Sequence, residues 1–274
     1  MISKLIRKKI NNLDKQASEL LSSRGLTHGL KRSLQSFKKE VVMFNNYASA
    51  THKHINGKNL KVQIGGGKHR INGFINIDIF PPADIIFDLR EKIPLASNST
   101  ELLFSEHFLE HIDYPISVKK FIKESFRVLR KGGKVIIGIP DTKRVIEAYV
   151  RKDKKTLKEY VSRWYKNRDN LEHFNTLIDI VNYHLRDQDD DEKYTPHLWG
   201  YDKEKIKSLL SGAGFKHIKD WKFNPVIANP KREFGSIYVE GKKVPLESKK
   251  SLIAYKSKLA RAVDLEDVKQ LQAL

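Results

Sequence analysis

The sequence predicts an α/β fold built around a mainly parallel β-sheet. From Lys61 onward, short β-type runs alternate with helical segments, which is the pattern of a parallel sheet with helical crossovers. The chain has 274 residues, of which 39% are hydrophobic, and this is enough to bury a substantial core. The β-type runs in the first part of this region occupy residues 61–65, 73–78, 83–88, 101–105 and 133–140.

Two helices carry clear start or stop signals. The first precedes the run at 133–140, and Gly132 and Gly133 are expected to end it in the left-handed conformation. Its apolar stripe consists of Val118, Phe121, Ile122, Phe126 and Leu129. The second helix begins after Asp202, a natural N-cap, and ends at Gly214. Two further strands are expected after it, at 216–223 and 235–239.

The chain divides into a central domain and flanking basic segments. The segments expected are a basic helical extension at 1–55, the domain at 56–245 with a helical insertion or lid at 143–200, and a basic helical tail at 246–274. Aliphatic residues recur at helical spacing near the start of the chain, at Ile2, Leu5, Ile6, Ile10 and Leu13. We favour a helix that caps the domain; the alternative is contact with anionic lipid or nucleic acid through Lys4, Arg7, Lys8 and Lys9.

Composition excludes several classes of protein. Lysine and arginine number 52 against 33 acidic residues, which gives a net charge of +19 and bears on partners rather than on fold. The absence of cysteine excludes a disulfide framework, a thiolate metal site and a cysteine nucleophile. No apolar run approaches the roughly 18 residues of a spanning helix, so we expect a cytoplasmic protein with peripheral membrane contact as an option.

Three glycines, Gly65, Gly66 and Gly67, directly follow the first strand. Glycines there let the backbone approach a ligand and expose its amide hydrogens. A dinucleotide fingerprint would need a further glycine three places on and an acid about 20 residues on, but Arg70 takes the glycine position and Asp78 comes much sooner. An oxidoreductase with a nicotinamide cofactor is therefore disfavoured. Asp78 at a strand end suits a ribose diol, because a carboxylate accepts two hydroxyl hydrogen bonds; a cap or turn role is the alternative.

Five segments occur in a fixed order between Lys61 and Asp141. They are Val62-Gln-Ile-Gly-Gly-Gly, then Asp78, then Asp88 before Ile93-Pro-Leu, then Ser105-Glu-His-Phe-Leu-Glu-His, and Glu124-Ser-Phe-Arg-Val-Leu-Arg-Lys-Gly-Gly-Lys. In this order they resemble class I S-adenosylmethionine-dependent methyltransferases, and a weaker similarity extends to Gly241. The resemblance implies a Rossmann-like sheet of seven strands with the last one antiparallel, and S-adenosyl-L-methionine as the cofactor.

The resemblance also implies which residues contact the cofactor. They would lie at the carboxyl ends of the first strands, as ligands do in open α/β sheets. The glycines would lie against the methionine part, Asp78 would hold the ribose, Asp88 and Leu89 would meet the adenine, and Glu106 with His107 would border the methyl group. The expected cofactor-binding set is Gly65, Gly66, Gly67, Asp78, Ile79, Asp88, Leu89 and Glu106.

The sequence departs from the family pattern in two places. Many relatives carry an acid where Gln63 stands, so one polar contact to the amino end of the cofactor would be replaced or lost. The chain between Gly67 and Phe74 is also too short for a crossover helix, which usually needs a dozen residues or more. We expect the first helix to be reduced to a turn, as in a branch of predicted methyltransferases with the same compressed segment.

His107, Glu110 and His111 match the H-x-x-E-H pattern of zinc proteases. The motif leaves a strand and soon meets Pro115, so little helix remains to hold two ligands on one face, and we expect no metal. A second segment has acids spaced as in a calcium-binding loop. Glu192 occupies the position where such a loop needs a glycine, so we expect a solvated loop instead. Its acids are Asp187, Asp189 and Asp191.

The leading hypothesis is methyl transfer to a small-molecule or saccharide-like acceptor, with the insertion as a lid. Transfer from a sulfonium is an in-line displacement, so alignment and exclusion of water are the main tasks. A base is needed only for a poor nucleophile such as a sugar hydroxyl, and the candidates are His107, His111 and His197 in that order, with a structural role as the alternative for His197. The second hypothesis is a nucleic-acid-binding or RNA-modifying protein that uses the basic surface.

Overall fold

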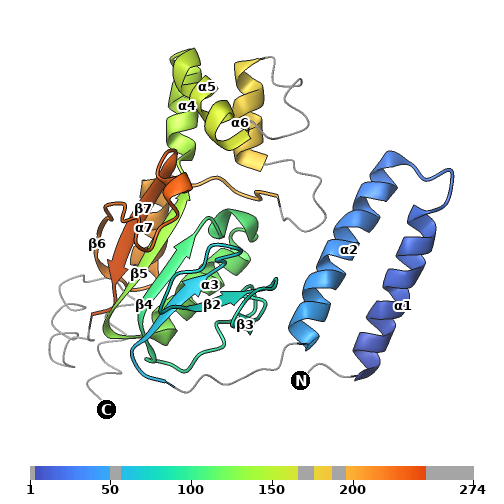
Figure 1. Cartoon of the computed structure of the whole chain (residues 1–274), viewed down its shortest axis with the longest axis horizontal. Helices are drawn as coiled ribbons and strands as arrows, with labels where there is room; N and C mark the ends of the chain where they lie inside the picture. Colours follow the sequence, from blue (N-terminus) through green and yellow to red (C-terminus); the bar gives the residue numbers. More distant parts are fainter. Residues whose placement is uncertain (1–3, 50–56, 166–175, 187–195, 245–274) are drawn as a thin grey trace, which may run out of the picture.

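The computed structural model describes residues 4–49, 57–165, 176–186 and 196–244. Within them, seven strands form one sheet in the order β3-β2-β1-β4-β5-β7-β6 (Figure 1). The strands are β1 (Leu60–Ile64), β2 (Ile75–Asp78), β3 (Ile85–Ile86), β4 (Thr100–Glu106), β5 (Leu129–Pro140), β6 (Lys216–Asp220) and β7 (Ser236–Lys242). β7 runs antiparallel to both of its neighbours and the other pairs are parallel, which confirms the predicted sheet.

The crossover between β1 and β2 contains no helix, as predicted from its length. Helices occur only in the connections after β4: α3 (Ile116–Val128) joins β4 to β5, and α7 (Lys203–Gly212) precedes β6, within the described residues of the domain. α7 begins as predicted, because the Asp202 side chain accepts a hydrogen bond from the Lys205 amide at 2.8 Å. α3 buries the predicted stripe, including Val118, Phe121 and Ile122, against the sheet.

The predicted end of α3 is wrong. The helix ends at Val128, and the chain passes directly into β5. Gly132 does have a positive φ of +79°, but it lies inside β5. Its neighbour Gly133 lies so close to the main chain that a Cβ there would stand 2.9 Å from the Arg130 carbonyl oxygen. The two glycines therefore allow an irregularity in the strand rather than a helix stop.

The insertion is helical where the structure describes it. Its elements are α4 (Thr142–Val150), α5 (Lys154–Tyr160), the π-helical turn η2 (Val161–Tyr165) and α6 (Leu177–Arg186). They stand above the carboxyl ends of the central strands (Figure 1) and form a small core of their own around Leu157, Tyr160 and Ile180. The acids Asp187, Asp189 and Asp191 and the tail at 246–274 lie outside the described residues.

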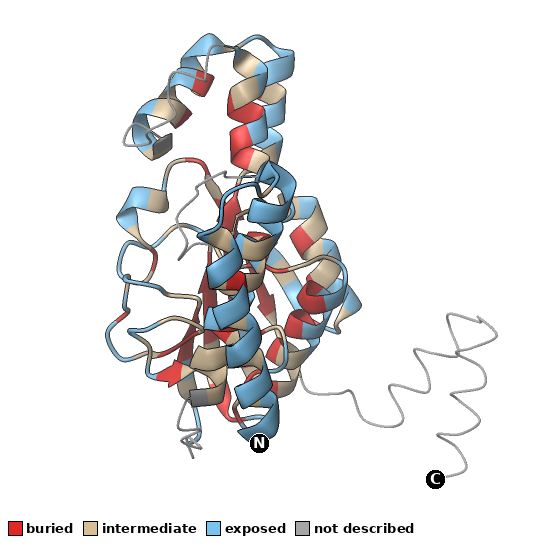
Figure 2. Cartoon of the chain, turned by 90° about the vertical axis from the view of Figure 1, so that its right-hand side faces the viewer, coloured by how far each residue is buried: buried red, intermediate tan, exposed pale blue. Residues whose placement is uncertain are grey.

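An antiparallel helical hairpin precedes the domain. It consists of α1 (Lys4–Leu21), which contains most of the predicted helical spacing, and α2 (His28–Ser49), and both lie within the helical extension expected at 1–55. Figure 2 shows this mostly exposed hairpin in front of the buried strands. α2 contacts the domain directly, because Asn46 Nδ2 donates to the Ile79 carbonyl at 3.0 Å and Tyr47 packs edge-on against Phe87. The helix that contacts the domain in this way is α2 and not the first helix, for which the capping role is predicted; α1 packs on the outer side of α2 (Figure 1). Among the described residues, no helix is both long and apolar enough to cross a membrane.

Candidate active site

The glycine turn after β1 is shaped by steric requirements at two positions. Gly65 has a φ of +62°, and a Cβ there would lie 2.8 Å from Phe108 Cδ2. A side chain at Gly66 would come within 2.6 Å of Gln63 Nε2. Gly67 also has a positive φ, of +52°, but faces open space, with no atom within 4 Å of the Cβ position among those described. The turn therefore packs tightly on its inner side and leaves Gly67 accessible to a ligand.

Asp78, at the end of β2, joins this turn to the neighbouring strand. Its Oδ2 accepts a hydrogen bond from the Gly67 amide at 2.9 Å, and its Oδ1 accepts one from the Phe80 amide at 3.0 Å. The residue is only 8% exposed. A carboxylate has about four acceptor positions, so two remain for another pair of donors such as a ribose diol.

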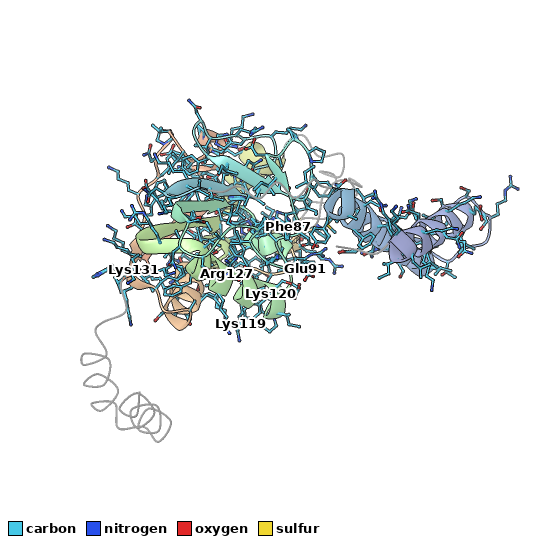
Figure 3. All side chains as sticks on the ribbon, turned by 90° about the horizontal axis from the view of Figure 1, so that it is seen from below. Phe87, Glu91, Lys119, Lys120, Arg127 and Lys131 are labelled. Carbon is cyan, nitrogen blue, oxygen red and sulfur yellow. The ribbon has the colours of Figure 1, made fainter. Side chains whose placement is uncertain are left out.

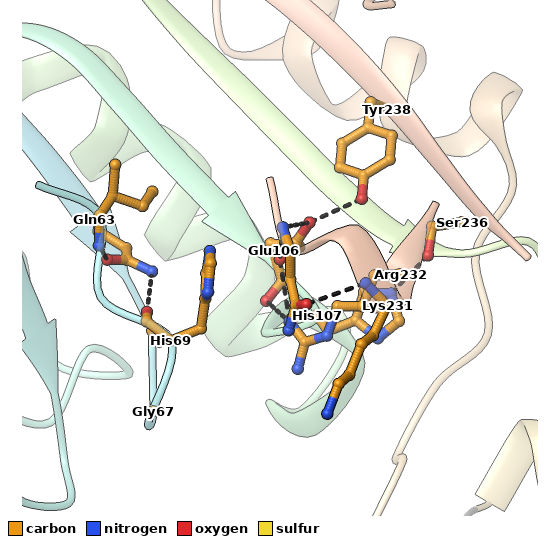
Figure 4. Close-up of polar contacts among 12 residues, drawn as sticks. Gln63, Gly67, His69, Glu106, His107, Lys231, Arg232, Ser236 and Tyr238 are labelled. Carbon is orange, nitrogen blue, oxygen red and sulfur yellow. Dashed lines mark hydrogen bonds and ion pairs between the residues drawn. The ribbon is translucent and has the colours of Figure 1, made fainter. Parts of the chain in front are cut away.

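The Gln63 side chain stabilises the short loop that connects β1 to β2. Its Nε2 donates to the His69 carbonyl at 2.6 Å and its Oε1 accepts from the Ile71 amide at 3.0 Å (Figure 4). The amide can do both, whereas an acid in this position could only accept. Gln63 therefore holds the compressed loop, which gives a structural reason for the departure from the family pattern.

Asp88, Arg90 and Glu40 form an ion-pair chain between the domain and the hairpin. Arg90 Nη2 lies 2.8 Å from Asp88 Oδ2 and 2.8 Å from Glu40 Oε2. The hydrogen bonds that the guanidinium donates to Glu40, and then those to Asp88, raise the pKa of Arg90, so its charge is permanent. Asp88 and Arg90 line a cavity of about 480 Å³ together with residues of α2 such as Phe37 and Phe44. Ile79 and Leu89 also belong to the expected cofactor-binding set, but they do not take part in this chain of ion pairs. Ile79 is half-buried under α2, and the Leu89 side chain packs into the main core.

Glu106, at the end of β4, points into a polar network. Its Oε1 accepts a hydrogen bond from the Tyr238 hydroxyl at 2.7 Å, and its Oε2 lies 3.4 Å from Arg232 Nη1 (Figure 4). The Asn229 amide lies 3.3 Å from both oxygens, and Arg232 also donates to the Glu106 carbonyl at 2.9 Å. Burial raises the pKa of the Tyr238 phenol. Glu106 therefore anchors the segment before β7, a role that the sequence does not indicate.

His107 is held in an unusual conformation beside this network. It has a φ of +53°, which costs a non-glycine residue about 1 kcal/mol or more and often marks functional sites. Its Nε2 is hydrogen-bonded to Ser236 Oγ at 2.8 Å, and its ring packs against Trp164 at 5.5 Å. Burial, assisted by Arg232, holds the pKa of His107 well below its usual range. The imidazole is therefore neutral at neutral pH.

Glu110, His111, His184 and His197 lie together beyond His107, and we call these five residues the histidine cluster. Glu110 and His111 belong to a single 3-10 turn, η1 (Leu109–His111), so the short helical stretch expected after β4 is confirmed. The His111 and His197 rings are 4.9 Å apart, and His197 Nδ1 donates to the His184 carbonyl at 2.8 Å. Burial raises the pKa of the Glu110 carboxyl and lowers the pKa of His184 to about 3.

The candidate site includes two residues that the sequence does not single out, His184 of the histidine cluster and the neighbouring Trp164. His184 and Trp164 belong to the insertion, and their rings stack at 5.9 Å with an interplanar angle of 14°. No motif marks either residue, because their place in the site depends on how the insertion folds back over β4. The three predicted histidines, His107, His111 and His197, do come together here.

Known proteins share features with this chain. A curated protein of Methanocaldococcus jannaschii, described as uncharacterized, is 28% identical over 148 residues, covering 49% of this chain and 68% of that protein. Among solved structures, a methyltransferase from Methanosarcina mazei is 14% identical with a TM-score of 0.43, covering 71% of this chain and 97% of that one. A Burkholderia thailandensis 1,6-didemethyltoxoflavin-N1-methyltransferase with S-adenosylhomocysteine bound is 11% identical with a TM-score of 0.40, covering 89% and 92%.

Residues 79–137 match a family model described as a methyltransferase domain. The match begins directly after Asp78 and runs through β3, β4 and α3 into β5. It includes three of the five ordered segments described in the sequence, those that begin at Asp88, Ser105 and Glu124. This segment of the chain is therefore similar to a methyltransferase domain. The strand order places the glycine turn, Asp78 and His107 together at the carboxyl ends of β1, β2 and β4.

Proposed function

We propose that the protein is a methyltransferase that binds S-adenosylmethionine over the carboxyl ends of β1, β2 and β3 and transfers its methyl group to a small-molecule or saccharide-like acceptor held beside the histidine cluster. The observation that supports this most strongly is the convergence of the histidine cluster with the glycine turn, since Phe108 packs against Gly65 and lies between His107 and Glu110 in the chain. Imidazole nitrogens and a buried carboxyl suit the recognition of hydroxyl groups, because they donate and accept hydrogen bonds.

Each cofactor contact in this proposal has a structural basis. Gly67 offers an accessible backbone next to the methionine part, and Asp78 retains acceptor capacity for the ribose hydroxyls. Asp88 contributes a carboxylate at the edge where adenine would lie. Glu106 binds Tyr238 and Arg232, so its contribution is to position these two residues near the place of the methyl group.

The acceptor side would be formed by the insertion, acting as a lid. His107, His111 and His197 are the candidates for a general base if the acceptor is a hydroxyl. The methyl group moves in line from sulfur to the acceptor atom, so the main contribution of these side chains is to align the acceptor and exclude water.

Calorimetry with S-adenosylmethionine and S-adenosylhomocysteine tests the cofactor part of the proposal. Mass spectrometry of cell extracts incubated with methyl-labelled cofactor tests the acceptor part, and the expected product is a methylated saccharide or other small hydroxyl compound. Absence of cofactor binding would refute the proposal as a whole, whereas labelled RNA or DNA would refute the acceptor class.

The basic surface favours the nucleic-acid hypothesis less than the net charge implies. Lys119, Lys120, Arg127 and Lys131 lie along one side of the domain (Figure 3), but Lys120 pairs with Glu91 and Arg127 with Glu124. Binding through several phosphates would weaken steeply with salt. Oligonucleotide binding that is absent, or that changes little between low and physiological salt, would remove this alternative.

The hairpin gives a reason to propose peripheral contact with an anionic membrane. In α1, Leu5 and Leu13 are 62% and 48% exposed, and Lys4, Lys8 and Lys9 on the same helix are exposed. Exposed aliphatic residues next to lysines suit a surface of anionic lipid. A lipid-carried saccharide acceptor would fit such a location.

A further inference from the structure

Three side chains of the histidine cluster bring potential metal ligands together. One ligand atom each from Glu110, His111 and His197 lies within 4.8 Å of the other two. Glu110 and His111 come from the turn after β4, whereas His197 comes from the end of the insertion. The Leu198 amide donates to the Glu110 carbonyl at 2.6 Å, so the two segments are held together next to the ligand atoms.

Within the described part of the chain, the Glu110 carboxylate is buried without the interactions that such a group normally makes. It is 1% exposed, and among the residues that the structure describes neither of its carboxylate oxygens has a hydrogen-bond partner. His107 Nδ1 lies 3.7 Å from Oε1, which is beyond hydrogen-bonding distance. Buried carboxylates in proteins are normally hydrogen-bonded, paired with a charge or coordinated to a metal. A cation at this point would supply the missing interaction.

His197 is already oriented as a metal ligand would be. Its Nδ1–H donates to the His184 carbonyl at 2.8 Å, so the lone pair lies on Nε2. Histidines that coordinate metals usually make such a bond with their other ring nitrogen, which sets both the tautomer and the ring plane. The nearby His184, itself buried against Trp164, fixes the position of that carbonyl.

We propose that Glu110, His111 and His197 bind a divalent transition-metal ion, with Zn²⁺ as the best fit. Two imidazole nitrogens and one carboxylate oxygen are a common zinc set, and three protein ligands leave a position open for water or substrate. Ligand atoms around a tetrahedral zinc lie about 3.4 Å apart, because each bond is about 2.1 Å long, so closing the site needs only small side-chain rotations. The sequence analysis expects no metal, because too little helix follows β4 to hold His107 and His111 as ligands on one face; in the proposed set the distant His197 takes the place of His107.

A role for this ion in catalysis rests on the proposed function. A hydroxyl of the acceptor would occupy the open position and lose its proton to water, since metal coordination lowers the pKa of a bound hydroxyl. Its oxygen would then form a bond to the methyl carbon while the sulfonium carbon–sulfur bond breaks, which releases S-adenosylhomocysteine. This step would explain how the enzyme activates a poor nucleophile inside a buried site.

Metal binding by the full-length protein, stripped with chelator, tests the proposal directly. Calorimetric titration with Zn²⁺ should show one equivalent, and Co²⁺ should give the visible absorption of a low-coordinate site. Glu110→Gln and His197→Ala should each weaken Zn²⁺ binding at least tenfold. The matched controls Glu91→Gln and His28→Ala change exposed residues outside the cluster and should bind as the wild type does.

Thermal unfolding supplies a second readout. Zn²⁺ should raise the melting temperature of the wild type and not that of Glu110→Gln, because a ligand stabilises only the form that binds it. If the variants fail to fold, zinc X-ray absorption of the wild type decides, since a cluster-bound ion must show imidazole neighbours. No zinc binding, binding equal in the cluster variants, or an ion without imidazole ligands would overturn the proposal. Loss of S-adenosylmethionine binding with the zinc site intact would refute the proposed function instead.

Discussion

The Gly67 amide donates a hydrogen bond to Asp78 Oδ2 at 2.9 Å, which ties the glycine turn of β1 to the end of β2. The chain between them is too short for a helix. This hydrogen bond therefore helps to fix the end of β1 relative to the end of β2, as a crossover helix would otherwise do. Asp78 therefore has two tasks, because it shapes the turn and presents its remaining lone pairs to the proposed ribose position.

Replacing Asp78 should weaken cofactor binding strongly. Hydrogen bonds to a charged group contribute about 1.5–3 kcal/mol each, so we expect Asp78→Ala to raise the dissociation constant of S-adenosylmethionine about ten- to hundredfold. Asp78→Asn, which keeps one acceptor oxygen, should lose less. Calorimetry checks both, with the exposed Asp220→Asn as the control. Unchanged affinity in Asp78→Ala would contradict the assigned role.

Gly65 and Gly67 should differ in their tolerance of alanine. Both have a positive φ, which costs an alanine about 1–2 kcal/mol, but only at Gly65 would the new methyl lie 2.8 Å from Phe108. Overpacking adds about 1–3 kcal/mol. Urea unfolding should therefore show a larger loss of stability for Gly65→Ala than for Gly67→Ala. Equal losses would mean that Phe108 moves away without cost.

Glu124 should make the stability of the protein sensitive to acid. It pairs with Arg127 at 2.7 Å and accepts a hydrogen bond from the Ile93 amide at 3.0 Å. The Arg127 bonds, and then the amide, hold the pKa of Glu124 below its ordinary value of 4.5, against the effect of burial. Because the folded-state pKa is depressed, the stabilisation is present above the unfolded pKa and is lost as pH falls through the folded one.

Glu124→Gln should accordingly destabilise the protein by about 1 kcal/mol at neutral pH. The difference from the wild type should shrink as the pH is lowered below 4.5. Urea unfolding at a series of pH values measures this. A difference that stays constant over the acid range would show that the carboxylate charge contributes nothing.

The α1 surface should bind anionic vesicles. Lys8→Glu with Lys9→Glu reverses two exposed charges, and each basic residue contributes about 1 kcal/mol near such a surface. We expect vesicle co-sedimentation to fall at least tenfold, while calorimetric affinity for S-adenosylmethionine is unchanged. Point substitutions are preferable to truncation, because deleting α2 would also remove Glu40 from Arg90. Equal sedimentation of variant and wild type would exclude this contact.

The sequence by itself determined the sheet and the glycine turn. The strands follow from local periodicity, and the start of α7 follows from the capping chemistry of Asp202. The absence of the first crossover helix follows from the length of the chain between β1 and β2. Each of these features depends on neighbouring residues alone, so the sequence predicts it. The end of α3 was predicted wrongly because a glycine pair signals a helix stop and a strand irregularity equally well. The exposure of the α1 aliphatics depends on packing with α2, which no local pattern encodes.

Only the tertiary structure decided which polar groups meet. Glu106 and Tyr238 are brought together because β4 and β7 both flank β5 and expose their ends at the same edge. Glu110 and His197 meet because the insertion returns over that edge, and their separation in the chain carries no sign of this contact. The histidines could be selected from the sequence by residue type, but their partners could not, because contacts between distant segments are set by the packing of the whole fold.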